Sequence, residues 1–275
     1  MVWSCLVSIL PGMAQTEKLT DYVNPFVGTD GYGNVYPGAQ IPFGGIQISP
    51  DTDSRFYDAA SGYKYNHLTL MGFSLTHLSG TGIPDLGDFL FIPGTGEMKL
   101  EPGTHEDPDQ GYRSRYSHDK EWASPNYYAV ELADYGVKAE MTSGVRSGMF
   151  RFTYPESDNA FIMIDMNHTL WQSCEWSNLR MINDSTITGY KLVKGWGPER
   201  HVYFTATFSK KLTGLRFVQD KKPVIYNTSR FRSSYEAWGK NLMACISFDT
   251  KAGEEVTVKT AISAVSTDGA RNNMK

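Results

Sequence analysis

The chain has 275 residues and carries 26 basic against 30 acidic side chains, a formal charge of −4 at pH 7. This length fits one large domain or two small ones, and the 40% hydrophobic and 20% charged composition is that of a globular rather than a disordered protein. The charge balance leaves no basic surplus for nucleic acid, and no apolar run reaches the roughly 18 residues that a membrane helix needs. We therefore expect no nucleic-acid partner and no membrane span.

The chain opens with a short apolar run over residues 2–10, followed by Pro11-Gly12 and a small residue. This order is typical of the second half of a secretory signal, so residues 1–15 are interpreted as a truncated signal-like segment. The usual basic start is missing, because no Lys or Arg precedes Lys18. An amphipathic tail is the alternative, but we expect a secreted or periplasmic protein.

The next part of the chain, to about residue 110, is rich in Gly, Pro and Asp, with dense loops at 28–33 and 79–88. Such loops commonly form surfaces that meet a ligand or another domain. The alternative is a set of tight turns that join strands.

From residue 127 onwards, short strand-like runs alternate with turn residues. Phe150, Phe152 and Tyr154 alternate with polar side chains, as in a half-buried strand. No amphipathic helix longer than about two turns is evident. Many short strands predict an all-β protein, one large β-sandwich domain over residues 16–265. The predicted strands are 127–132, 137–141, 149–154, 161–166, 186–192, 202–208, 215–218, 224–226, 242–248 and 256–265.

The familiar catalytic motifs of nucleotide-binding proteins, serine hydrolases and zinc proteases are absent from the sequence. Asp85 and Asp88, which follow His77, form a pair of carboxylates of the kind that glycoside hydrolysis uses for acid/base work. A structural role in capping turns is the favoured reading of this pair, and loop-locking that of His77.

Several aromatic side chains offer faces on which a sugar ring could stack, although we expect most of them to lie in the core. They are Tyr57, Tyr63, Tyr65, Trp171, Trp176 and Trp196. Cys5 would leave with the signal, and Cys174 and Cys245 could pair in an oxidising compartment or stay as buried thiols. No Cys/His spacing suggests a zinc site.

A series of short motifs runs in order through the first 93 residues. It comprises 21–29 (DYVNPFVGT), 37–39 (PGA), 41–44 (IPFG), 47–52 (QISPDT), 61–65 (SGYKY), 72–82 (GFSLTHLSGTG), 85–88 (DLGD) and 92–93 (IP). In this order the series resembles the N-terminal part of the family 92 glycoside hydrolases, which are calcium-dependent exo-α-mannosidases. The resemblance is dense over residues 21–96 and weaker but continuous to the end.

The resemblance implies a β-sandwich of the galactose-mutarotase-like kind (a supersandwich) packed on a larger (α/α)6 barrel, with the active site between the two. It also implies inversion at the anomeric carbon by a Glu acid and an Asp base, with calcium on the mannose 2- and 3-hydroxyls. The catalytic carboxylates and most calcium ligands are expected in the helical domain, so no residue here inherits a catalytic role. Residues 266–275 are then expected to begin a linker to that missing C-terminal helical domain.

The resemblance leaves one wall of the substrate pocket to this chain, formed by two loops. Relatives specific for α-1,2 linkages often carry Trp in the first loop, whereas residues 55–60 contain none. The expected substrate-binding residues are Tyr57 and Asp58 in the first loop, and His77, Ser79, Gly80, Thr81, Gly82, Asp85 and Asp88 in the second.

These observations predict the N-terminal domain of an inverting α-mannosidase that removes mannose, mainly α-1,2-linked, from oligosaccharides in N-glycan degradation and is inactive or nearly so alone. One alternative is a stand-alone carbohydrate-binding module. A weaker one is a mutarotase-like epimerase with His77 or His201 as the acid/base.

Overall fold

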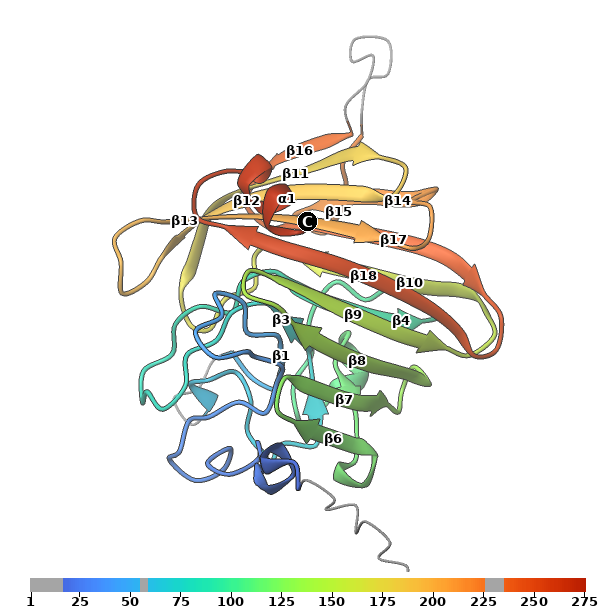
Figure 1. The fold of residues 1–275 in the computed structure, drawn as a ribbon. Helices are drawn as coiled ribbons and strands as arrows, with labels where there is room; N and C mark the ends of the chain where they lie inside the picture. Colours follow the sequence, from blue (N-terminus) through green and yellow to red (C-terminus); the bar gives the residue numbers. More distant parts are fainter. Residues whose placement is uncertain (1–16, 55–58, 226–234) are drawn as a thin grey trace, which may run out of the picture.

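A computed structural model of the chain describes residues 17–54, 59–225 and 235–275. Over these residues the chain forms a β-sandwich in which each pair of neighbouring strands is antiparallel (Figure 1). The prediction of an all-β sandwich is therefore confirmed. The signal-like segment 1–15 lies outside the described residues.

The smaller of the two main sheets has seven strands among the described residues. In spatial order they are β1 (Ser49–Asp51), β3 (Gly72–Ser74), β4 (Leu90–Thr95), β10 (Ser157–Asp165), β17 (Leu242–Thr250), β14 (Gly214–Gln219) and β15 (Lys222–Pro223).

The larger sheet has nine strands within the same described ranges. In spatial order they are β16 (Glu236–Gly239), β11 (Ser173–Asn183), β12 (Thr186–Lys194), β13 (Arg200–Phe208), β18 (Glu254–Ser263), β9 (Ser147–Tyr154), β8 (Val137–Ser143), β7 (Tyr127–Leu132) and β6 (Glu121–Ser124). A short pair of strands, β2 (Thr69–Leu70) and β5 (Ser114–Arg115), lies outside both sheets. So do the 3-10 turns of the described residues, at Leu19–Tyr22, Pro108–Gln110 and His118–Lys120.

Strand β9 shows why the alternating pattern folds as it does. Phe150, Phe152 and Tyr154 are buried between the sheets, and the side chain of Arg151 between them points to solvent. Burying these rings drives the packing of the two sheets, since each large apolar side chain removed from water contributes about 1.5–3 kcal/mol. Most of the predicted strands coincide with observed ones, including 127–132, 202–208 and 242–248.

The predicted strand at 224–226 is wrong in its described part. Strand β15 ends at Pro223, and Ile225 is 92% exposed. Proline has no amide hydrogen to donate to a ladder. The amide of Val224 still donates to the carbonyl of Phe217 on β14 at 2.9 Å, but the ladder does not continue to Ile225. Tyr226 lies outside the described residues.

The middle of β10 is buried on both faces, from Ala160 to Ile164. One face packs into the main core between the sheets, and the other joins a second apolar cluster on the outer side of the smaller sheet. Met98 and Leu100 pack against that second cluster. A strand covered on both sides carries a continuous apolar run rather than an alternating one.

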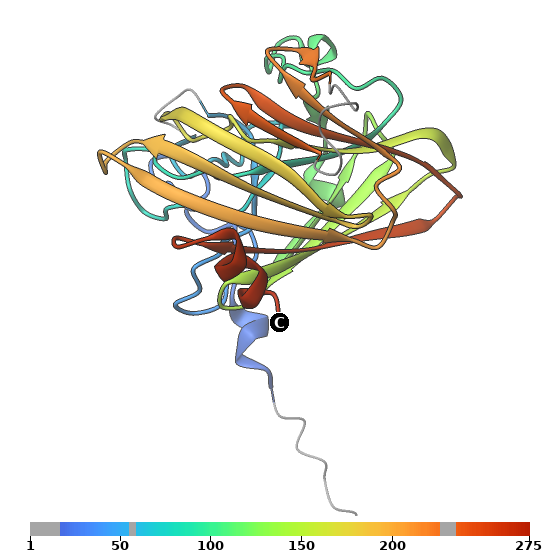
Figure 2. The ribbon, with the colours of Figure 1, turned by 90° about the horizontal axis from the view of Figure 1, so that it is seen from above.

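The chain ends in helix α1 (Thr267–Asn273), which packs against β18 and β13 (Figure 2). Ser266 caps the helix by accepting a hydrogen bond from the amide of Gly269 at 2.9 Å. Ala270, within the helix, is fully buried. Within the described part of the chain, no helix is long and apolar enough to cross a membrane.

Candidate functional site

Three loops that are far apart in the sequence meet at one end of the sandwich: residues 77–89, 166–172 and 195–199. The amide of Leu170 donates to the carbonyl of Leu86 at 2.9 Å, and the amide of Trp196 donates to Asp85 Oδ2 at 3.3 Å. Leu90, the first residue of β4, pairs with Asp165, the last of β10, so the sheet register brings the first two loops to the same edge. The third loop joins β12 to β13 and projects at the left of Figure 1.

Beneath these loops, the carboxylate of Asp51 lies between two histidines. Its Oδ1 is 2.8 Å from His77 Nε2, and its Oδ2 is 2.9 Å from His168 Nε2. The other ring nitrogen of His77 is 2.8 Å from the carbonyl of Gln47. Burial alone would raise the pKa of Asp51, but His77 and His168 outweigh it and hold that pKa below its usual value. The favoured reading of His77, a residue that locks its loop, agrees with these contacts.

Asp88 is the centre of a second buried cluster. Lys191 Nζ lies 3.1 Å from Asp88 Oδ1, and both side chains are 0% exposed. Arg200 donates to both carboxylate oxygens, at 2.6 and 3.2 Å, and Thr76 Oγ1 donates to Oδ2 at 2.7 Å. Burial opposes ionisation, yet Lys191 and Arg200 hold the pKa of Asp88 well below its usual value. A carboxylate held in this way is not available to take or give a proton.

The two clusters are joined through Lys191, whose ammonium donates to the carbonyl of His168 at 2.6 Å. The loop 166–172 is therefore tied to Asp51 by a side chain and to Asp88 by its backbone. This network fixes the three loops relative to one another, because each of its buried charges has a partner of opposite sign or a hydrogen bond.

Above the network, the loop reaches solvent between Ser79 and Ile83. Ser79, Gly80 and Gly82 are exposed, and Thr81 is half-buried with its hydroxyl donating to the carbonyl of Ile83 at 3.0 Å. The predicted second loop thus has two parts. Its tip offers hydroxyl and backbone groups to solvent, and its ends, at His77 and Asp88, are buried.

Asp85 differs from Asp88 although the two are three residues apart. Its Oδ1 accepts a hydrogen bond from the amide of Leu86 at 2.6 Å, and its Oδ2 accepts one from the amide of Trp196. Both carboxylate oxygens therefore hold backbone amides of the loops in place. The structure therefore gives the two carboxylates different surroundings, backbone amides for Asp85 and buried cations for Asp88. Tyr57 and Asp58, predicted for the first loop, lie outside the described residues.

Gly87 connects the two carboxylates and has a φ of +76°. A Cβ there would lie 2.7 Å from Leu170 Cγ and 2.8 Å from the Leu170 amide nitrogen. We expect Gly87→Ala to lower the free energy of unfolding by about 2–4 kcal/mol, because backbone strain and overpacking add. Urea unfolding of the purified chain measures this change.

Gly80→Ala is the matched control, since Gly80 has a φ of +75° but no atom lies within 4 Å of the position that a Cβ would take there. Its expected cost is about 1 kcal/mol, from strain alone. Equal costs for the two variants would show that the contact with Leu170 does not fix this turn.

The expectation that most of the six aromatic residues lie in the core is wrong for the three tryptophans. Trp171, Trp176 and Trp196 are 55%, 46% and 59% exposed, whereas Tyr63 is buried and Tyr65 is 37% exposed. Two of these indoles, on Trp171 and Trp196, belong to the loops that meet at this end of the sandwich. Position in a loop rather than in a strand explains their exposure.

Sequence analysis did not single out Asp51, His168, Lys191 or Arg200 as site residues. One signal was present: Lys191 interrupts an apolar strand, and a charged residue at a core position is almost always paired. Its partner could not be named, because Asp88 precedes it by many strands and no local spacing connects them.

No cluster of three or more His, Cys, Asp or Glu side chains among the described residues could hold a metal ion. Asp51 and Asp88, the most buried carboxylates of this end, are occupied by histidines and by Lys191 and Arg200. Cys174 and Cys245 are both buried free thiols, so they do not form a disulfide with each other.

Comparison with known proteins gives a family for most of the chain. The family described as the glycosyl hydrolase family 92 N-terminal domain matches residues 22–263. An uncharacterized secreted glycosidase from Arthroderma benhamiae is 30% identical over 139 residues, which cover 50% of this chain and 17% of that protein.

Two solved structures superpose on the chain with a TM-score of 0.76 each. One is a GH92 family glycosyl hydrolase, 26% identical, with 92% of this chain and 33% of that chain covered. The other is a family GH92 inverting mannosidase from Bacteroides thetaiotaomicron, 25% identical, with 94% and 34% covered. The chain thus spans about a third of these structures and less than a fifth of the curated relative.

Proposed function

Since the chain belongs to glycosyl hydrolase family 92, whose N-terminal domain it matches over residues 22–263, we propose that it forms one wall of the sugar pocket of an inverting exo-α-mannosidase. The observation that carries the proposal is the exposed loop tip at 79–83, held above a buried network of paired charges. The likeness to an inverting mannosidase from Bacteroides thetaiotaomicron supports the choice of substrate.

The role proposed for this wall is to bind and orient the sugar. Ser79 and Thr81 carry hydroxyl groups, and Gly80 and Gly82 leave the backbone open to a close approach by sugar hydroxyls. Asp88 and Arg200 hold the base of this loop, so its tip is already ordered when a ligand arrives. A pre-ordered wall also helps exclude water from the reacting bond.

Inversion needs two carboxyl groups about 6.5–9.5 Å apart, one to protonate the leaving oxygen and one to activate water. Asp51 and Asp88 are ion-paired, and Asp85 binds two backbone amides. We therefore propose that both catalytic carboxylates, and the calcium ligands of the whole enzyme, come from a helical domain that packs on this wall. Preference for α-1,2 linkages and action on N-glycans belong to the same proposal.

Secretion or periplasmic export is also part of the proposal. It is supported by the curated relative, which is described as secreted, and by the signal-like order of residues 1–15. Fractionation of the cells that naturally make the protein, with the protein detected by immunoblot, tests it. Export into the periplasm or medium is the expected result, and retention in the cytosol the contrary one.

The test of the proposed function is mannose release from α-1,2-, α-1,3- and α-1,6-linked mannobiose, with calcium and with chelator. The chain alone should release no mannose under either condition. Adding a separately expressed helical domain of a family 92 relative should give calcium-dependent release. Release by the chain alone that Asp85→Asn abolishes would contradict the proposal, because it would place a catalytic carboxylate on this wall.

A further inference from the structure

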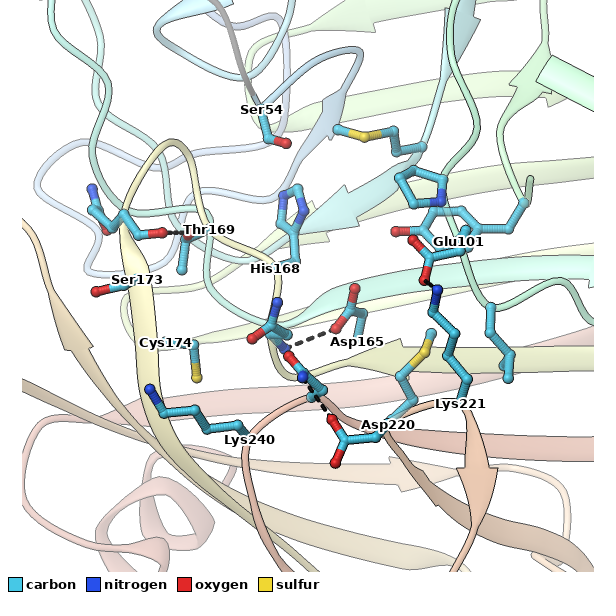
Figure 3. Close-up of a pocket in the computed structure, with 18 of the residues that line it drawn as sticks. Ser54, Glu101, Asp165, His168, Thr169, Ser173, Cys174, Asp220, Lys221 and Lys240 are labelled. Carbon is cyan, nitrogen blue, oxygen red and sulfur yellow. Dashed lines mark hydrogen bonds and ion pairs between the residues drawn. The ribbon is translucent and has the colours of Figure 1, made fainter. Parts of the chain in front are cut away.

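A cavity of about 900 Å³ lies beside the loop 166–172, on the outer side of the smaller sheet (Figure 3). Its size falls within the range of small-molecule sites, about 300–1,000 Å³. Its lining includes Asp165, His168, Tyr112 and Glu101, together with the turns that carry Lys221 and Lys240. No described residue of 77–88 lines this cavity, so it is separate from the loop tip at 79–83.

The walls of the cavity are tied together by polar contacts between distant segments. Lys221 Nζ lies 2.7 Å from Glu101 Oε1, which joins the turn after β14 to the loop that covers the smaller sheet. Asn241 donates to Asp220 Oδ1 at 2.7 Å, which joins the turns after β16 and β14. Lys240 lies 3.3 Å from Glu175 on β11. The cavity is thus formed before any ligand enters, which reduces the entropy lost on binding.

Asp165 supplies an acceptor inside the cavity. Its Oδ1 accepts a hydrogen bond from the amide of Asn167 at 2.8 Å. Burial raises the pKa of Asp165, and burial together with Asp165 raises the pKa of the Tyr112 phenol. The amide of His168 and the phenol of Tyr112 also donate to this carboxylate. A carboxyl group has about four acceptor positions, so these three contacts leave capacity for one ligand hydroxyl.

Gln172 lines the same cavity and carries a side-chain amide whose Nε2 and Oε1 are both buried without a hydrogen-bond partner among the described residues. Leaving a buried polar group unpaired costs about 1–3 kcal/mol. An amide that can both donate and accept is the natural partner of a hydroxyl group, which does the same.

Trp171 stands at the edge of the cavity in an unusual conformation. Its φ is +70°, which is rare for a bulky side chain, and its indole is 55% exposed. The turn is held by Thr169 Oγ1, which donates to the carbonyl of Gln172 at 2.8 Å, and by the bond from Leu170 to Leu86. Such backbone strain persists only where the surroundings impose it, and it concentrates at ligand sites.

We propose that this cavity binds one neutral sugar unit of a glycan, with the indole of Trp171 against the ring face and Asp165 and Gln172 hydrogen-bonded to its hydroxyls. A neutral ligand is favoured because Lys221 and Lys240 are already paired with Glu101 and Glu175. The apolar face and the hydroxyl groups of a pyranose match an aromatic ring beside polar acceptors. This inference goes beyond the proposed function, since it needs no residue of the loop 77–88 and no turnover.

The experiment is a titration of the whole chain with methyl α-D-mannopyranoside, methyl α-D-glucopyranoside and methyl α-D-galactopyranoside, followed by calorimetry and tryptophan fluorescence. Saturable binding of at least one sugar is expected, with a Kd on the order of 1 mM. Trp171→Ala should weaken it about three- to tenfold, and Asp165→Asn about tenfold. Each variant is first checked for a wild-type urea midpoint.

Two control variants make the assignment specific. Trp122→Ala removes an exposed indole from β6, at the opposite edge of the larger sheet from β11, and should leave the Kd unchanged. Phe43→Ala removes an exposed ring that does not line the cavity and should also leave the Kd unchanged. The inference is overturned if no sugar gives a saturable signal, if Trp171→Ala and Asp165→Asn bind as the wild type does, or if Phe43→Ala abolishes binding. None of these results bears on mannose release, so the proposed function stands or fails separately.

Discussion

Replacing Asp88 by alanine is expected to lower the free energy of unfolding by about 3–5 kcal/mol. Lys191 is 0% exposed and lies 3.1 Å from Asp88, and Arg200 donates to both of its carboxylate oxygens. Without the carboxylate, the ammonium of Lys191 remains buried with the carbonyl of His168 and the ring face of Phe89 as its partners, neither of which carries a negative charge. An uncompensated buried charge is far more costly than the loss of a surface ion pair. Urea unfolding of the purified chain, followed by circular dichroism, measures the change.

Asp85→Ala is the matched control, because it removes a carboxylate of the same loop that has no cationic partner among its described contacts. Its expected cost is about 1 kcal/mol, from two hydrogen bonds to backbone amides, one of them long at 3.3 Å. A second variant, Lys191→Met with Asp88→Asn, removes both charges together and should recover much of the stability. If Asp88→Ala costs no more than Asp85→Ala, the buried ion cluster does not hold the loop.

The second large effect is expected at acid pH, where Asp51 loses its charge. Asp51 is held below its usual pKa against the opposing effect of burial, by His77 and His168. A carboxylate with a lowered pKa in the folded state contributes stability that is complete above its unfolded pKa, about 3.9, and is lost as the pH falls toward its folded pKa. Wild-type stability should therefore fall steeply below about pH 4.

Asp51→Asn should be less stable than the wild type at pH 7 and should lose less stability on acidification. Because this variant has no carboxylate to protonate at position 51, its free energy of unfolding should depend less steeply on pH than that of the wild type, by up to about 1.4 kcal/mol per pH unit. Urea midpoints between pH 7 and pH 2 measure it. Asp158→Asn, which removes an exposed carboxylate at the start of β10, should leave the slope as in the wild type. Equal slopes for Asp51→Asn and the wild type would show that Asp51 does not drive acid unfolding.

The strands could be predicted from sequence where apolar and polar residues alternate or where a long apolar run occurs. Strand β7 (Tyr127–Leu132) coincides with its prediction, and the inward rings of β9 follow from the alternation of its sequence. Strand β11 (Ser173–Asn183) was missed, because polar residues and two bulges interrupt its pattern. Its place is set by pairing with β12 and β16, which is tertiary information that no local window contains.

The candidate site was predictable as a loop but not as a network. The motif at 72–88 marked the loop, and a structural role was the favoured reading of Asp88. The identity of its partners depends on β12 and β13 of the larger sheet reaching the loop that precedes β4 of the smaller sheet, so Lys191 and Arg200 could not be assigned from spacing. Exposure of Trp171 depends on a left-handed residue in a turn, a conformation that sequence does not predict for tryptophan.

Strand β10 lies in the middle of the smaller sheet, between β4, which precedes it in the chain, and β17, which follows it. During synthesis on the ribosome, β10 therefore emerges well before the strand that covers one of its edges. Until residues 242–250 are available, an apolar strand with an open edge is exposed, which is the kind of segment that chaperones bind and that aggregates. The order of the strands thus means that the nascent chain is protected from aggregation only after strands near its C-terminus have been synthesised.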